Sequence, residues 1–241
     1  MPNFVADNVR SAESQLLLRA VAEELKIPLL HIVRSSELSL LSNDSPDIAL
    51  NTIRQSAGTA LTLLDSYLLG LELADTQDQL ELEPISVNSA LYDVMNELDQ
   101  VATQHQTKLQ LNISNNVGLV MANALGLRAA LLSLGVAFIE AQTLQPQTRT
   151  IYLTAHKRAD HILAGLYAEN SPISAHQLNA AFKLYGLMRQ PLTQLSANSA
   201  AGIFVAKNII QAMAGELNSV RHNRQRGLAA IFQSSKQLSF I

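Results

Sequence analysis

The sequence predicts an α+β protein in which an N-terminal antiparallel helical hairpin precedes an α/β sandwich. Three observations predict this fold. Apolar residues in the first third of the chain recur at alternating four- and three-residue steps, which is the a/d pattern of helices that pack on other helices. Beyond Asp75, helical and strand-like segments mix without strict β-α-β alternation, which is typical of an α+β sandwich. The hydrophobic content of 48% is sufficient for a substantial core.

The predicted hairpin is defined by two apolar stripes. The first comprises Leu18, Ala22, Leu25, Leu29, Ile32 and Ser36, and the second comprises Ile53, Ala57, Ala60, Leu64, Tyr67 and Leu71. Residues 43–46 interrupt the pattern, and Pro46 suits the first turn of a helix. A single hairpin buries only one stripe per helix, so we expect a homodimer through residues 11–75 that forms a four-helix bundle. The alternative is that the hairpin packs on the C-terminal domain of its own chain.

The chain of 241 residues is long enough for two small domains, and the change in pattern places them at 1–76 and 77–241. In the second domain, the predicted strands are 80–83, 108–113, 150–155, 161–167, 216–220 and 228–232. The predicted helices are 86–104, 125–141 and 202–213, with Ser86 as an N-cap and Gly215 at the end of the last helix. The last two strands are expected to form a hairpin through residues 224–227.

The composition argues against several classes of protein. The 17 basic and 20 acidic residues give a net charge of −3, which disfavours nonspecific binding to nucleic acids. The absence of cysteine excludes disulfides and thiolate metal sites. Residues 1–15 do not resemble a secretory signal, and the apolar runs Leu131–Ile139 and Ile203–Ile210 are too short to span a membrane. We therefore expect a cytoplasmic protein with no nucleic-acid or membrane partner.

The segment Val21–Leu29 resembles the phosphoacceptor box of the sensor histidine kinases, which reads roughly His-Glu-Leu-Arg-Thr-Pro-Leu. The identical positions are Glu24, Leu25, Pro28 and Leu29. Lys26 is a basic match, whereas Glu23 occupies the phosphoacceptor position. In order and spacing, the segments 123–140, 168–174, 198–203 and 205–217 are similar to the magnesium-binding helix, the two glycine boxes and the following helix of this family. The resemblance extends over residues 14–235 and implies a dimerisation and phosphotransfer hairpin followed by an ATPase domain of the histidine kinase type.

The resemblance also implies where nucleotide and magnesium would be held, and these positions lack the required groups. A carboxylate at Glu23 cannot form a phosphoramidate, and its charge repels the incoming phosphoryl group. Ser133 and Ala137 replace the asparagines that bind magnesium, and Ala168 replaces the aspartate that holds the adenine amino group. The glycine boxes carry Asn170, Pro172, Asn198 and Ala200, and only Gly202 remains. We therefore expect that binding of ATP and magnesium is lost and that the chain carries no metal or other cofactor.

These departures imply a catalytically impaired signalling protein that binds a two-component partner, either a response regulator or a histidine kinase, through its dimeric helical bundle. The residues expected to face this partner are Glu23, Glu24, Lys26 and Ile27. One alternative is an ATP-independent histidine phosphotransferase that uses His31, but eight residues rotate its side chain by about 80° from Glu23. Two further alternatives are an active sensor histidine kinase with divergent motifs and a structural subunit that only shares the fold.

Two other clusters have residue types that bind ligands. His156 and His161 flank a predicted hairpin turn and are possible metal ligands, although turn residues at this spacing more often face solvent. A second cluster comprises Arg221, His222, Arg224 and Arg226. It is either a site for a phosphate or an acidic partner, or a solvated turn.

Overall fold

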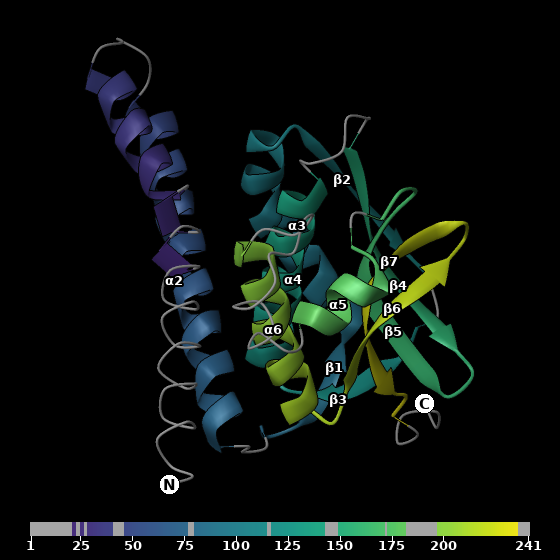
Figure 1. The fold of residues 1–241 in the computed structure, drawn as a ribbon. Helices are drawn as coiled ribbons and strands as arrows, with labels where there is room; N and C mark the ends of the chain where they lie inside the picture. The colour runs from purple at the N-terminus through teal and green to yellow at the C-terminus, as the bar shows by residue number, and fades with distance from the viewer. Residues whose placement is uncertain are drawn as a thin grey trace, which may run out of the picture.

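The computed structural model describes residues 21–22, 25–26, 28–40, 46–76, 80–114, 117–142, 149–171, 173–181 and 197–235. The described part forms three layers, in which a helical hairpin and a five-stranded sheet enclose a middle layer of helices (Figure 1). The hairpin consists of residues 28–40, which are helical, and α2 (Pro46–Thr76). The other helices are α3 (Val87–Gln104), α4 (Ala124–Gln142), α5 (Ala175–Ala181) and α6 (Ala197–Ala212). This mixed architecture confirms the predicted α+β fold.

The large sheet has the strand order β2-β4-β5-β7-β6, and β2 pairs with β4 in parallel while the other pairs are antiparallel. Its strands are β2 (Thr107–Ile113), β4 (Arg149–Arg158), β5 (His161–Ala168), β6 (Glu216–His222) and β7 (Gln225–Gln233). A small second sheet pairs β1 (Glu83–Ser86) with β3 (Leu119–Ala122). Alternate residues of β4, including Ile151, Leu153 and Ala155, are fully buried against the helices, as the period of two requires. The sheet therefore presents one face to the helical core and a second face away from it.

Most predicted elements of the second domain are confirmed, and the differences have local causes. α3 begins after its N-cap Ser86, whose side chain accepts a hydrogen bond from the Ser89 backbone, as predicted. β1 lies at 83–86 instead of 80–83, because Pro84 is tolerated in an edge strand with one neighbour. The turn of the last hairpin is Asn223-Arg224, so the prediction of a turn over residues 224–227 was wrong. The prediction also missed the short elements β3 and α5.

α2 packs on the C-terminal part of its own chain. This arrangement is the predicted alternative to a dimeric four-helix bundle. Leu63, Tyr67 and Leu73 belong to the same buried cluster as the cores of α3, α4 and α6. The buried α2 residues Ser56, Thr59, Leu63, Ser66 and Gly70 each precede a predicted stripe residue by one position. The buried face of α2 is therefore rotated by about 100° from the predicted stripe.

Two kinds of contact hold α2 in this position. Gly70 permits close approach to α6, since a Cβ at this position would lie 2.7 Å from Val205 Cγ1. Asn208 Nδ2 donates to the Gly70 carbonyl at 3.4 Å, and Gln100 Nε2 donates to Ser56 Oγ at 2.7 Å. Burial of a large apolar side chain stabilises by about 1.5–3 kcal/mol, so the buried Tyr67 and Leu63 make this a substantial contact. The hairpin and the sandwich consequently share one core.

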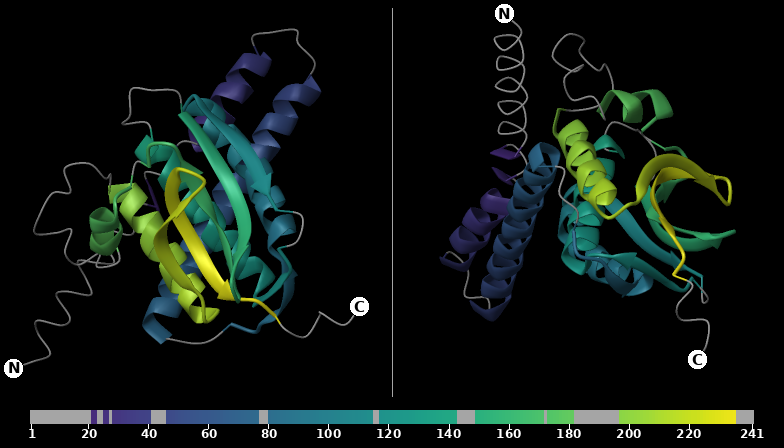
Figure 2. Two further views of the ribbon diagram at one scale, coloured as in Figure 1. Left: turned by 90° about the vertical axis from the view of Figure 1, so that its right-hand side faces the viewer. Right: turned by 90° about the horizontal axis from the view of Figure 1, so that it is seen from below.

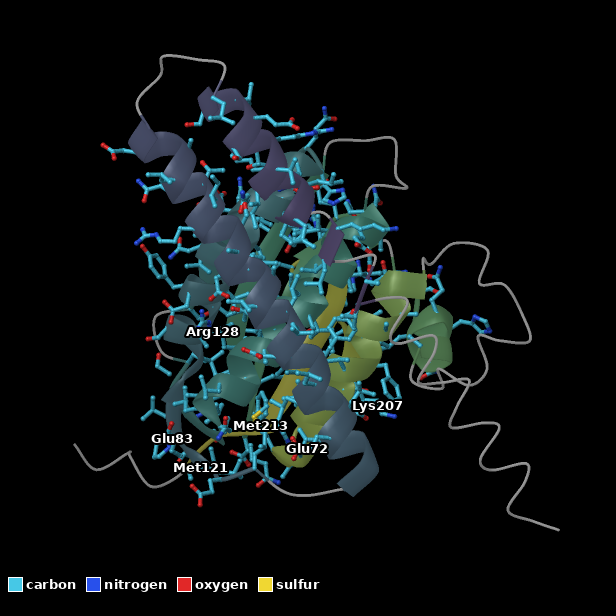
Figure 3. The ribbon with its side chains drawn as sticks, turned by 90° about the vertical axis from the view of Figure 1, so that its left-hand side faces the viewer. Glu72, Glu83, Met121, Arg128, Lys207 and Met213 are labelled. Carbon is cyan, nitrogen blue, oxygen red and sulfur yellow. The ribbon has the colours of Figure 1, made fainter. Side chains whose placement is uncertain are left out.

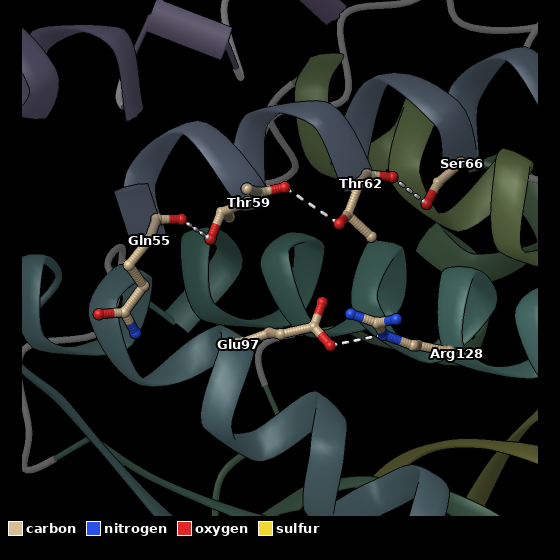
Figure 4. A network of polar contacts seen from close by, with 7 residues as sticks. Gln55, Thr59, Thr62, Ser66, Glu97 and Arg128 are labelled. Carbon is tan, nitrogen blue, oxygen red and sulfur yellow. Dashed lines mark hydrogen bonds and ion pairs between the residues drawn. The ribbon is translucent and has the colours of Figure 1, made fainter. Parts of the chain in front are cut away.

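The polar side chains on this part of α2 bond to their own helix. Thr59 Oγ1, Thr62 Oγ1 and Ser66 Oγ donate to the carbonyls of Gln55, Gly58 and Thr62 at 3.1, 3.0 and 2.6 Å (Figure 4). These bonds satisfy hydroxyl groups that would otherwise be costly to bury. Below them, Arg128 Nε of α4 contacts Glu97 Oε1 of α3 at 2.6 Å. Ser56 has a partner across the interface in Gln100, whereas Thr59, Thr62 and Ser66 are satisfied by carbonyls of their own helix.

α4 is the central helix of the molecule. It is the one helix in the described part of the chain whose length and composition would suffice to cross a membrane, so the expectation from short apolar runs alone was too strict. Most of its residues are buried, including Leu127, Leu131, Leu134 and Phe138. Its apolar character is that of a core helix, which contacts α2, α3 and α6.

α6 ends in a Schellman motif one residue before the predicted glycine. The Gly215 N–H donates to the Ile210 carbonyl at 2.9 Å, and the Ala214 N–H donates to the Gln211 carbonyl at 3.0 Å. The residue in the left-handed conformation is Ala214, with φ of 55°. Alanine has a Cβ, so this position carries a conformational cost that glycine would not have.

Replacing Ala214 by Gly should increase the free energy of unfolding by roughly 0.5–1 kcal/mol, because relief of the left-handed strain exceeds the entropic cost of glycine. The measurement is the midpoint of urea unfolding followed by circular dichroism. Ala212→Gly is the control, because Ala212 is the last helical residue and glycine there should lower stability. Equal destabilisation by both substitutions would contradict the assignment of strain to Ala214.

Candidate functional site

Several of the positions predicted for a nucleotide site lie where α4 packs against α6. Ser133 and Ala137 of α4 and Ala200 of α6 are buried, at 1%, 0% and 0% exposure. Gly202 of α6 packs directly on the two α4 residues, because a Cβ at this position would lie 2.9 Å from the Ser133 carbonyl oxygen and 3.3 Å from Ala137 Cβ. The small side chains at this contact therefore allow the two helices to approach closely.

α6 begins earlier than predicted, and this changes the nature of the second glycine box. Residues 197–212 are helical, so Asn198, Ala200 and Gly202 lie in the first turns of a helix. Alanine is the residue with the highest helix propensity, and Ala197, Ala200 and Ala201 favour this conformation. The segment is thus continuous helix, and the surviving Gly202 serves close helix packing in this structure.

The other predicted positions lie at the end of β5. Ala168 is the last residue of β5 and is buried, whereas Asn170 is exposed in the segment that follows. Pro172 lies outside the described residues. Ile173 is buried in the main core, and α5 packs on α6 and β6. The end of β5 therefore presents a methyl group to the core at the position where the family resemblance implies a carboxylate.

Few groups in this region are able to bind a metal ion or a phosphate. Ser133 Oγ is buried and has no hydrogen-bond partner. Glu140 lies seven residues after Ser133 on the same face of α4, and its Oε2 accepts a hydrogen bond from Ser199 Oγ at 3.3 Å. This carboxylate was not predicted from the sequence, although its spacing from Ser133 indicates it. In the part of the chain that the structure describes, no group of three or more His, Asp or Glu residues could hold a metal ion.

The region of the phosphoacceptor box lies partly outside the described residues. This applies to Glu23, Glu24 and Ile27, so their predicted roles remain predictions. Lys26 is exposed and Pro28 is buried. His31 is half-buried on the same helix.

The helical hairpin forms one outer layer of the molecule and lies in front of the sandwich in Figure 3. It holds eight of the eleven large hydrophobic side chains that are exposed among the described residues. They are Leu29, Leu30, Val33, Leu38, Leu40, Leu50, Leu61 and Leu68. Exposed apolar side chains concentrated on one part of a protein indicate an interaction site more often than an ordinary solvated face.

A third cluster, on the face of the sheet away from the helices, contains His156, Tyr167 and His222. The rings of His156 and His222 stack with centroids 3.8 Å apart, although β5 and β7 separate their strands in the sheet order. Strong curvature of the sheet allows this contact (Figure 2). Burial, together with the nearby His222 and Arg158, lowers the pKa of His156 to about 4. Burial also lowers the pKa of His222 and raises that of Tyr167.

The geometry of this cluster does not suit a metal ion. A metal bound by a histidine lies near the plane of the imidazole ring, and two rings stacked at an angle of 21° do not share a plane. His161, the other predicted ligand, is exposed at the start of β5, five residues along the hairpin from His156. The buried His156 Nδ1 and Tyr167 hydroxyl have no hydrogen-bond partner. The cluster is therefore a packed contact between neutral rings.

Comparison with known proteins supports the fold. No family model and no curated protein matches the sequence. Among solved structures, full-length ShkA in complex with AMPPNP has a TM-score of 0.56 and 14% identity, and the match covers 98% of this chain and 47% of ShkA. The catalytic domain of histidine kinase ThkA has a TM-score of 0.50 and 14% identity, over 64% of this chain and 97% of that domain. The chain therefore has the fold of the histidine kinases.

The stability of the protein should decrease as the pH is lowered from about 6.5 towards 4. In this range the unfolded chain binds a proton at His156 that the folded protein does not bind, so protonation favours unfolding. The measurement is the urea midpoint at a series of pH values. His156→Gln should show a weaker dependence, whereas the control His161→Gln, at an exposed position, should retain it. An unchanged dependence in His156→Gln would contradict this assignment.

Proposed function

We propose that this protein is a catalytically impaired, histidine-kinase-like signalling protein that binds a two-component partner in the cytoplasm. The observation that carries the proposal is the packing of Gly202 on Ser133 and Ala137. The sequence resemblance to the histidine kinases implies that these positions correspond to those that hold magnesium and the phosphates. Here they form a close contact between two helices, and their side chains offer one hydroxyl group.

Loss of nucleotide binding follows from the sum of several departures. Ala168 has no acceptor for an adenine amino group, and Ala137 has no ligand atom for magnesium. Each missing hydrogen bond costs about 1–2 kcal/mol of binding free energy, and a tenfold change in affinity corresponds to about 1.4 kcal/mol. These losses together support a protein that retains the fold without the ATPase activity. Glu23 at the phosphoacceptor position supports the same conclusion, since its carboxylate cannot form a phosphoramidate.

Titration with ATP and magnesium should therefore give no binding stronger than a Kd of about 1 mM. The measurement is isothermal calorimetry on the full chain, with a nucleotide-binding histidine kinase catalytic domain as the positive control. Micromolar binding would contradict the proposal.

A transfer assay separates the proposal from the alternative phosphotransferase. The protein is incubated with a phosphorylated receiver domain, and acid-labile label on the chain is measured for the wild type and for His31→Ala. We expect no label on either protein. Label that disappears in His31→Ala would establish the phosphotransferase and overturn the proposal.

The proposed partner surface is the helical hairpin. Its exposed leucines favour a homodimer in which two hairpins form a bundle, because a bundle would remove this surface from water. We propose a seam on α2 through Leu50, Leu61 and Leu68, which are exposed. Of the predicted stripe, Tyr67 is buried in the core of its own chain and the other residues are half-buried. Lys26 is exposed near the start of the same hairpin and suits a contact with a regulator or kinase together with Glu23, Glu24 and Ile27.

The double substitution Leu61→Glu and Leu68→Glu should convert the dimer into a folded monomer, because two buried charges per copy would oppose association. Light scattering coupled to size-exclusion chromatography gives the mass, and circular dichroism confirms the fold. Leu82→Glu with Leu125→Glu is the matched control, since both leucines are exposed outside the hairpin. A monomeric wild-type protein, or the same loss of mass in the control, would refute the predicted dimer face.

A further inference from the structure

The tip of the β6–β7 hairpin concentrates positive charge. Arg221, Arg224 and Arg226 are all exposed and lie within six consecutive positions at the end of this hairpin. None of these guanidinium groups has an ion pair with a carboxylate of the described residues. Glu169 follows Ala168, the cross-strand partner of Arg226, and its carboxylate also has no ion pair among the described residues. Glu216, the one acidic residue of the hairpin, lies at its other end. The charge of the tip is thus unbalanced, although the whole chain has a net charge of −3.

Two features of this tip are unfavourable for folding. Arg221 and Arg226 are direct cross-strand partners, and like charges in such a pair repel one another. Both turn residues, Asn223 and Arg224, have positive φ, at 46° and 66°. A two-residue turn of this kind favours Asn followed by Gly, so Arg224 occupies the position that glycine would occupy at lower cost. Both departures from the stable choice add positive charge to the same tip.

The tip is also held in place. His222 stacks on His156 of β4, which anchors the end of β6 against the outer face of the sheet. An anchored hairpin loses less conformational entropy when it binds a partner than a mobile one does. Local choices that oppose stability are expected at functional sites, where another interaction compensates for them.

We propose that Arg221, Arg224 and Arg226 form a docking site for an acidic segment of a partner protein. Guanidinium groups bind carboxylates in a planar, two-bonded geometry, and carboxylates between Arg221 and Arg226 would remove their repulsion. This site lies on the sandwich and does not depend on the proposed function of the hairpin.

The chemistry of the tip favours a protein over other anions. Nonspecific binding to nucleic acid requires a broad basic surface, and here three arginines stand on a chain of net negative charge. Binding to a lipid surface is aided by apolar or aromatic side chains that insert into it, and among the described residues the large exposed ones lie on other elements. An acidic polypeptide needs neither feature.

The test uses a fluorescein-labelled oligoglutamate peptide and fluorescence anisotropy on the full chain. Arg221→Gln with Arg226→Gln should weaken binding at least about tenfold. Lys108→Gln with Lys157→Gln removes the same charge from exposed positions on β2 and β4 and should leave the affinity nearly unchanged. Equal weakening in both variants would overturn the proposal, because it would indicate attraction by overall charge. Tighter binding to a DNA duplex or to phosphatidylserine vesicles than to the peptide would also overturn it.

Arg224→Gly separates a docking role from a structural one. It should raise the midpoint of thermal unfolding, because glycine suits the turn, and it should weaken binding of the peptide. A lower midpoint would assign Arg224 a structural role and refute the proposal, and so would an unchanged affinity.

Discussion

α4 and α6 lie against one another along much of their length, and the small residues at their contact permit this approach. Gly202 faces Ser133 and Ala137, and a larger side chain at any of these positions would separate the helices. α4 also packs on α3 and α2, and α6 packs on α2 and β6. The hairpin on one side and the sheet on the other are therefore both placed by this helix pair. Protein interiors are close-packed, so the pair has little freedom to open.

This packing connects the fold to the proposed function. A nucleotide site requires space and polar groups between its walls, whereas the α4–α6 contact is filled by the helices themselves. At Ser133 and Ala137, where the sequence resemblance implies magnesium ligands, the chain carries small residues that suit close helix packing. In the proposed function, the same residues account for both the absence of nucleotide binding and the close packing of α4 on α6. The core that this chain shares with the fold of the histidine kinases consists of helix and sheet packing.

The molecule combines this rigid interior with two surfaces that are unfavourable for an isolated chain. One is the apolar side of the hairpin, where leucines are exposed to solvent. The other is the arginine tip of the β6–β7 hairpin, where like charges are paired across the strands. Both lie away from the α4–α6 contact, one on each outer layer of the fold. Such an arrangement suits a protein that brings partners together, since each surface can be covered without disturbing the core.

The sequence by itself determined the elements whose signals are local. Residues close together in the chain determine the Ser86 N-cap of α3, the alternation in β2 and the helical character of the hairpin, so these features were predictable. Tertiary structure decided which face of α2 is buried, because Gly70 of α2 fits closely against Val205 of α6 on a face that carries small polar residues. It also decided the meeting of His156 and His222, which requires curvature of the whole sheet. The close approach at Gly202 likewise depends on two helices far apart in the sequence, and local patterns carry no information about which distant surfaces will fit together.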